Sequence, residues 1–163
     1  MDIRKLDHSA LVVSDMERAR WFYGTVLGLS EVPRPSNFTF SGAWFRGDGF
    51  EIHLILAADT PAQVGFGNAG PASSYGLAHH LGFEVADLAA AVAQLHKHGV
   101  PIAGGPLPRG DGPVQLYFYD PDGNYIELFQ WGYTQELPIE ERTALRYTIL
   151  FIVAIRSTKG AYQ

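Results

Sequence analysis

The sequence contains no cysteine among its 163 residues. Disulfide bonds, thiolate catalysis and cysteine-based zinc or iron–sulfur sites are therefore excluded. It also lacks any cluster of lysine and arginine, and its formal net charge is −5. A protein that binds nucleic acid or an anionic membrane surface needs a positively charged patch, so neither is expected as a partner.

Long hydrophobic runs are missing as well. The longest, residues 149–155, has seven residues, whereas a membrane-spanning helix needs roughly 18 or more. The first residues run straight into a strand-like segment without the apolar stretch of a signal peptide. The expected location is the cytoplasm.

Apolar residues make up 47% of the chain, enough for the core of one domain. Residues 6–13 alternate as a strand, and apolar residues at helical spacing follow until Gly28. Ser14 to Glu17 has the Ser-x-x-Glu form of a capping box, which predicts the start of that helix. Three further strands are expected near residues 29–33, 38–46 and 50–57, between glycines and prolines.

The same order of elements returns after a segment rich in Gly, Pro, Ala and Ser. Asp87 and Gly99 are typical of the start and the end of a second helix. This helix would follow a strand at 79–85 and precede strands near 100–103, 113–119 and 125–131. The predicted organisation is one α+β structural domain made of a first βαβββ module (1–58), a linker (59–78), a second βαβββ module (79–131) and a C-terminal extension (132–163).

The C-terminal extension is apolar over residues 147–155 and helix-like from Pro138. An apolar appendage on a small domain often packs against a second subunit, so a homodimer is expected.

Residues 120–129 combine a tight turn with a strand. Asp-Pro-Asp-Gly-Asn favours a hairpin reversal, because proline presets φ and Gly123 accepts a positive φ. The strand that follows places Glu127 on the same face as Tyr125 and Phe129. Taken alone, this glutamate would be interpreted as a surface residue.

An internal repeat changes that interpretation. An offset of 72 residues aligns His8 with His80, and an offset of 74 aligns His53 with Glu127. Duplicated supersecondary units often face each other about a local two-fold axis, which would bring such equivalent positions to one cavity. Each of these four side chains lies on the less apolar face of its predicted strand.

Three imidazoles and one carboxylate suit a divalent metal ion such as Zn, Ni, Co, Mn or Fe. His8, His80 and Glu127 alone would make the two-histidine, one-carboxylate set of non-haem Fe(II) sites. A single histidine on a strand is more often a surface residue, and the repeat is what favours ligation here. His79 is predicted to face the helix instead of the site.

Several motifs together resemble one superfamily over about residues 5–131. They are the Asp7-His8 strand, Trp21-Phe22-Tyr23 with Leu27-Gly28-Leu29, Ile52-His53-Leu54, the His80 strand, and Asp120-Pro121-Asp122-Gly123-Asn124 with Ile126-Glu127-Leu128. This pattern is similar to the vicinal oxygen chelate superfamily of glyoxalases, bleomycin-resistance proteins and extradiol dioxygenases. The resemblance implies paired βαβββ modules that form a cupped mixed sheet. It also implies that metal ligands come from the first and fourth strands of each module, the positions of His8, His53, His80 and Glu127.

The resemblance implies a metal-dependent, glyoxalase-like enzyme of lyase or isomerase type. Its substrate would be a small carbonyl or vicinal-oxygen compound, chelated through two oxygens while an enediolate charge is stabilised. Glu127 is the expected general base, since it is the acidic member of the set. Four aromatic residues are candidates for lining the substrate site: Trp44, Tyr117, Tyr119 and Phe129.

Two alternatives remain open. His53 stands where glyoxalase I usually has glutamate, so an Fe(II)-dependent extradiol-type dioxygenase using the other three ligands is one of them. The other is a non-catalytic protein that binds an antibiotic or toxin, although such relatives generally lack these ligand residues.

Overall fold

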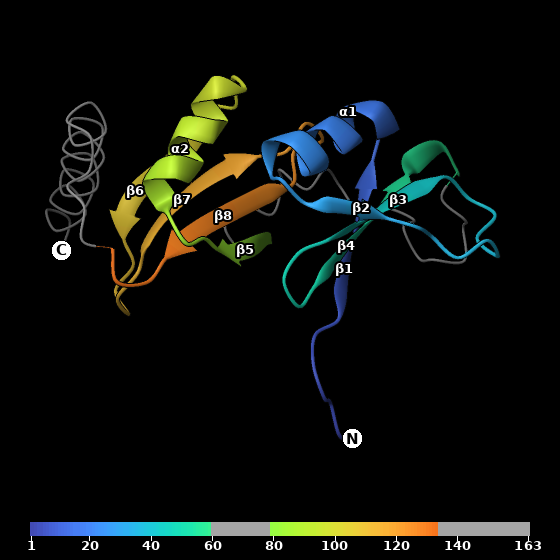
Figure 1. Ribbon diagram of the computed structural model, residues 1–163, viewed down its shortest axis with the longest axis horizontal. Coiled ribbons are helices and arrows are strands. Elements are labelled where there is room, and N and C mark those ends of the chain that lie inside the picture. Colours follow the sequence, from blue (N-terminus) through green and yellow to red (C-terminus); the bar gives the residue numbers. More distant parts are fainter. Residues whose placement is uncertain (60–78, 134–163) are drawn as a thin grey trace, which may run out of the picture. The chain divides into compact units, whose positions relative to one another are not determined.

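The computed structural model describes residues 1–59 and 79–133. The chain divides into two compact units. Unit 1 comprises Met1–His80 together with Tyr119–Tyr125, and unit 2 comprises Leu81–Phe118 and Ile126–Gln163. Figure 1 shows a helix and a small sheet in each part of the chain.

The sheet of unit 1 has four strands in the order β1-β4-β3-β2. Their bounds are β1 His8–Val13, β2 Ser30–Val32, β3 Gly42–Arg46 and β4 Glu51–Leu56. Strand β1 runs parallel to β4, whereas β3 is antiparallel to both β2 and β4. The strand predicted near residues 38–46 is shorter in the structure: β3 begins at Gly42, and residues 38–41 lie outside any strand.

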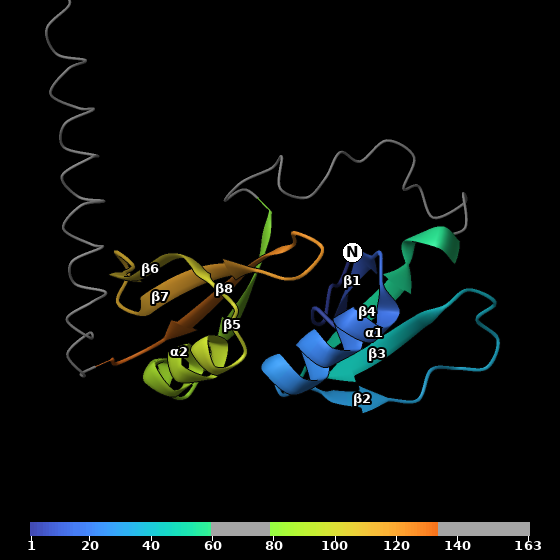
Figure 2. The same ribbon diagram turned by 90° about the horizontal axis from the view of Figure 1, so that it is seen from above.

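One face of this sheet is covered by helix α1 (Met16–Arg20), which continues as a π-helical turn, η1 (Trp21–Val26) (Figure 2). The helical residues Phe22 and Tyr23 are buried with Phe45 of β3. Because side chains alternate along a strand, the residues next to Phe45 and Ile52 project from the opposite face. The side chains of Trp44 and His53 are therefore on the face away from the helix.

The predicted capping box at Ser14 is wrong by one residue. Asp15 is the N-cap, since its extended backbone lets the side chain accept a hydrogen bond from the Arg18 amide at 3.0 Å. Ser14 is engaged elsewhere, because its amide donates to Asp122 Oδ1 at 2.9 Å. The predicted helix end at Gly28 is confirmed by its positive φ of 71°.

The second sheet has the equivalent order, β5-β8-β7-β6. Its strands are β5 His80–Glu84, β6 Ile102–Pro108, β7 Val114–Tyr119 and β8 Tyr125–Gln130, and helix α2 is Leu88–Lys97. Asp87 caps α2 by accepting from the Ala90 amide at 2.9 Å, as predicted. Strand β6 extends to Pro108, beyond the predicted end at 103, because Leu107 and Pro108 pair with β7.

The core of unit 2 lies between α2 and this sheet. The apolar residues of α2, Leu88 and Leu95, are buried, and so are Leu116 and Phe118 of β7. Side chains of even-numbered β7 residues thus pack toward the core, and those of odd-numbered residues, Tyr117 among them, project from the other face. The predicted α+β fold of two βαβββ modules is confirmed.

The predicted hairpin reversal at residues 120–124 is also confirmed. The Asp120 amide donates to the Asn124 carbonyl at 3.0 Å, and Gly123 has a φ of 85°. The Asp120 carboxylate accepts from the amides of Asp122 and Asn124 at 2.9 and 2.7 Å. The turn therefore fixes where β8 begins.

Two predicted segments fall outside the described residues: the linker after Asp59, and the extension from residue 134 on. The helix and strand expected in the extension, and the homodimer inferred from them, stay predictions. Within residues 1–59 and 79–133, no helix is long and apolar enough to cross a membrane.

Candidate functional site

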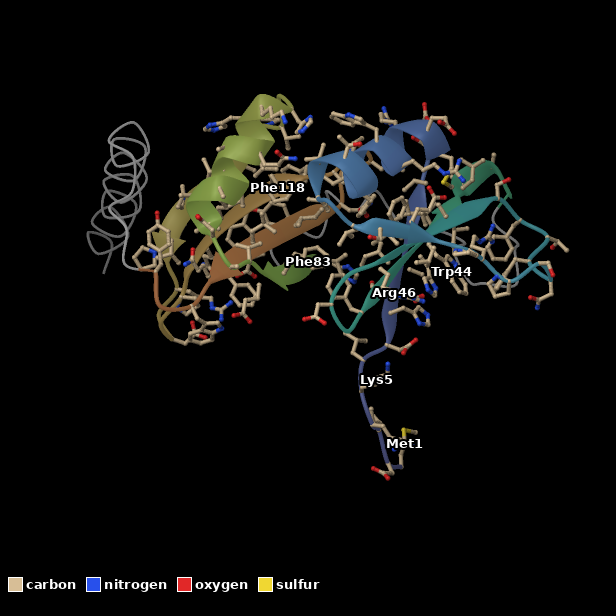
Figure 3. All side chains as sticks on the ribbon, viewed as in Figure 1. Met1, Lys5, Trp44, Arg46, Phe83 and Phe118 are labelled. Atoms are coloured by element: carbon tan, nitrogen blue, oxygen red, sulfur yellow. The ribbon has the colours of Figure 1, made fainter. Side chains whose placement is uncertain are left out.

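Three of the predicted site residues form one stack of rings in unit 1. The His53 ring lies between the other two, with its centroid 3.9 Å from Trp44 and 4.2 Å from His8. These residues come from β4, β3 and β1, which are neighbouring strands. Figure 3 labels Trp44 and Arg46, which both leave β3 two residues apart and so share a face.

His53 is held in place by a carboxylate that the sequence did not single out. Its Nε2 lies 2.9 Å from Glu51 Oε2, and Arg46 donates to the other oxygen of Glu51 at 2.9 Å. His53 and then Arg46 hold the pKa of Glu51 below its ordinary value, so this carboxylate stays ionised. Histidines that bind metals are commonly oriented in this way through their second ring nitrogen.

The sequence contained a signal for Glu51. It stands two residues before His53 on one strand, so both side chains must share a face. A carboxylate two residues from a histidine on one strand can accept a hydrogen bond from a ring nitrogen of that histidine.

His80 lies at the start of β5 among tyrosines. Its ring is 6.5 Å from that of Tyr125, which in turn is 4.7 Å from Tyr119. Both His80 and Tyr119 are exposed. His79, predicted to face the helix, precedes the strand and is exposed instead, because the strand pattern begins only at His80.

Glu127 is buried in unit 2, where its side chain is only 6% exposed. The surface position that this strand suggests when taken alone does not apply. Its Oε1 accepts from Arg109 Nη1 at 3.1 Å. Its Oε2 lies over Gly82 of β5, 3.3 Å from the position that a Cβ atom would take there.

Tyr117 and Phe129 belong to the same region of unit 2. Burial, and then the charge of Glu127, raise the pKa of Tyr117 above its ordinary value. The guanidinium of Arg109 lies 4.7 Å from the centre of the Phe129 ring. Arg109 was missed from the sequence because it lies in the loop after β6, where no strand pattern assigns it a face, and its partner Glu127 is 18 residues away.

The donor set fits a divalent metal ion in its chemistry, since imidazole nitrogen and carboxylate oxygen are ordinary ligands. Among residues 1–59 and 79–133, no three His, Cys, Asp or Glu side chains are grouped as a metal ion would need. An imidazole binds metal in the plane of its ring, and the planes of His8 and His53 are 15° from parallel, so one ring must turn.

His8 is the ring that can turn. Its side chain is 47% exposed, whereas that of His53 is 13% exposed and held by Trp44 and Glu51. Rotation of an exposed side chain between rotamers is fast and requires no change in the backbone.

Two βαβββ modules of equivalent strand order, with histidine or glutamate on the first and fourth strands of each module, define the class of protein to which this chain belongs. The chain belongs to the Glyoxalase/Bleomycin resistance protein/Dioxygenase superfamily, which it matches over residues 5–128.

Relatives in this family carry different activities in their names. Glyoxylase I 4 of Arabidopsis thaliana is 27% identical over 129 residues, which cover 78% of this chain and 71% of that protein. Catechol-2,3-dioxygenase of Bacillus subtilis is 30% identical over 76% of this chain, but the match spans only 40% of that longer protein. A glyoxalase/dioxygenase structure from Nostoc punctiforme has 32% identity and a TM-score of 0.64, and the match covers 80% of this chain and 92% of that one.

Proposed function

We propose that the protein is a metal-dependent, glyoxalase-like enzyme of lyase or isomerase type, acting on a small carbonyl or vicinal-oxygen compound. His8, His53, His80 and Glu127 would hold the divalent ion, which could be Zn, Ni, Co, Mn or Fe. The observation that carries this proposal is the orientation of His53 by Glu51 at 2.9 Å, beside the ring of His8. Histidines that bind metals usually have their other ring nitrogen held by a carboxylate or a carbonyl in this way.

When bound, the metal would supply a Lewis acid to two neighbouring substrate oxygens and so stabilise enediolate charge. Glu127 would take the proton that leaves carbon. Its burial suits this role, because a general base that is shielded from water keeps the abstracted proton in the site. We assign proton transfer to Oε2, the oxygen that lies over Gly82 of β5.

The predicted aromatic residues would bind and orient the substrate. Trp44 offers a flat surface beside His53, and Phe129 and Tyr117 lie near Glu127 in unit 2. Flat rings beside a few polar groups are typical of sites for small molecules.

Exchange of a carbon-bound proton tests the proposal. The purified protein would be stripped of metal and reconstituted separately with Zn, Ni, Co, Mn and Fe(II). It would then be incubated in D2O with the hemithioacetal of methylglyoxal and glutathione, and with α-hydroxyketones. Nuclear magnetic resonance should show metal-dependent deuterium incorporation or conversion of at least one probe.

Glu127→Gln should lower this rate by at least about 100-fold, because a general base commonly contributes 10²–10⁴-fold. His96→Gln serves as the control, since His96 is an exposed residue of α2. Failure of the wild-type protein to bind any of the five metals would reject the proposal. A tightly bound ligand unaffected by a chelator would favour a binding protein instead.

The second candidate is an Fe(II)-dependent extradiol-type dioxygenase that uses His8, His80 and Glu127. It is favoured by the 30% identity to the catechol-2,3-dioxygenase of Bacillus subtilis. Loading the protein with iron under anaerobic conditions, followed by catechols and oxygen, distinguishes the two. Oxygen uptake would establish this candidate over the first, and no uptake with any catechol would remove it.

A further inference from the structure

Arg109 links two carboxylates of unit 2 with the two sides of its guanidinium group. Nη1 donates to Glu127 Oε1 at 3.1 Å. Nε and Nη2 donate to the two oxygens of Asp111 at 2.7 and 3.1 Å. The two carboxylates differ in exposure, since the Asp111 side chain is 58% exposed and that of Glu127 is 6% exposed.

Aromatic rings hold the guanidinium between these partners. Its central carbon lies 4.7 Å from the centre of the Phe129 ring and 5.6 Å from that of Trp131. Gly112, in the loop between β6 and β7, lies close to Trp131, because a Cβ atom at this position would be 3.1 Å from the indole. Arginine is suited to such a place, since its planar group can stack on rings and bind two carboxylates at once.

Arg109 pairs with two carboxylates at once. Arg109 contributes one positive charge, whereas Asp111 and Glu127 contribute two negative charges. If a cation took Glu127, Arg109 and Asp111 would remain as a neutral, doubly hydrogen-bonded pair. Arg109 can therefore release Glu127 while it keeps both hydrogen bonds to Asp111 and its aromatic contacts.

We propose that Arg109 is a placeholder for the metal: it pairs with buried Glu127 in the metal-free protein, and it releases Glu127 and stays with Asp111 alone when a divalent ion binds the carboxylate. A buried carboxylate without a compensating cation is strongly destabilising. The guanidinium of Arg109 supplies a compensating positive charge to Glu127. The same charge competes with a metal ion for this carboxylate and repels the ion. The inference rests on the proposed function, since it takes Glu127 as a metal ligand.

The consequence is a measurable effect on metal affinity. Arg109→Gln removes the competing charge, so metal should bind more tightly by roughly tenfold, the scale of groups that contact metal ligands. Arg109→Lys keeps a positive charge and should bind metal no more tightly than the wild type. Arg20→Gln is the matched control, because it removes an arginine that pairs with Glu31 and Glu17 in unit 1.

Co²⁺ is a suitable probe, because its binding can be followed by visible absorption and by competition with a coloured chelator at fixed pH. Circular dichroism of each variant confirms folding. Thermal melting gives a second reading: metal-free Arg109→Gln should melt below the wild type. Saturating Co²⁺ should then raise its melting temperature by more than that of the wild type.

The outcomes separate the two proposals. Tighter binding by Arg109→Gln but not by the other two variants supports the placeholder. Unchanged or weaker binding by Arg109→Gln, with Co²⁺ binding by the wild type intact, overturns it and leaves the proposed function standing. If the wild type and all variants fail to bind Co²⁺ or any other of the five metals, both are overturned.

Discussion

Tyr23 and Asp120 form a buried polar pair whose groups are both satisfied. Tyr23 is 0% exposed, and its hydroxyl donates to Asp120 Oδ2 at 2.8 Å. The same carboxylate accepts from the Asn124 side chain at 2.7 Å and from two turn amides. One hydroxyl thus connects η1 to the turn that starts β8.

Replacing Tyr23 with Phe should lower the free energy of unfolding by about 1–2 kcal/mol, because Asp120 loses a donor while it stays buried. Chemical denaturation followed by circular dichroism measures this. The matched control is Tyr119→Phe, since Tyr119 is 44% exposed and its change should cost less than about 0.5 kcal/mol. Equal losses of unfolding free energy in Tyr23→Phe and Tyr119→Phe would contradict a stabilising role for the hydrogen bond between Tyr23 and Asp120.

The buried hydroxyl of Tyr23 should also make the free energy of unfolding fall at alkaline pH. Burial, and then the charge of Asp120, raise the pKa of Tyr23 well above its ordinary value of 10.0. The unfolded chain loses the phenolic proton first as pH rises, so stabilisation present below about pH 10 is lost above it. Denaturation curves between about pH 8 and 11 should show a steeper decline for the wild type than for Tyr23→Phe.

Strand β6 depends on a glycine for its approach to β7. Gly105 has a φ of 83°, and a Cβ atom there would lie 2.6 Å from the Gln115 carbonyl oxygen. Strands can come this close, and adopt this backbone, only where no side chain intervenes. The register between β6 and β7 shifts between Gly104 and Leu107, the interval that contains Gly105.

Gly105→Ala should therefore lower the free energy of unfolding by about 1–3 kcal/mol, through backbone strain and the clash with β7. Gly110→Ala is the control, because a Cβ atom at Gly110 would meet nothing within 4 Å. Both can be measured by urea denaturation. A cost at Gly105 no larger than at Gly110 would show that the strand adjusts freely.

At the scale of elements, the sequence predicted what depends on local pattern. Asp87 and Gly99 bound their helix as expected, because capping is a property of a few adjacent residues. Ser14 was misassigned because its hydrogen-bond partner, Asp122, lies 108 residues away in the sequence. The extension of β6 was missed for the same reason, since pairing with β7 sustains it where the local pattern is weak.

At the scale of the whole molecule, the repeat predicted the equivalent strand order of the two sheets. It also selected His8 and His53, which the structure places 4.2 Å apart. It could not predict Glu51 holding His53 or Arg109 holding Glu127. Neither pair is repeated in the two halves of the sequence: Glu51 stands two residues before His53 on β4, and Arg109 reaches Glu127 from the loop after β6.

The central claim is that four repeat-selected side chains hold one divalent ion. Crystals soaked with Co²⁺ or Ni²⁺ test it directly through anomalous diffraction at the absorption edge of the metal. The account predicts one strong peak with His8, His53, His80 and Glu127 within roughly 2.0–2.3 Å of it. Absence of a peak at saturating metal, or a peak held by other residues, would contradict the claim.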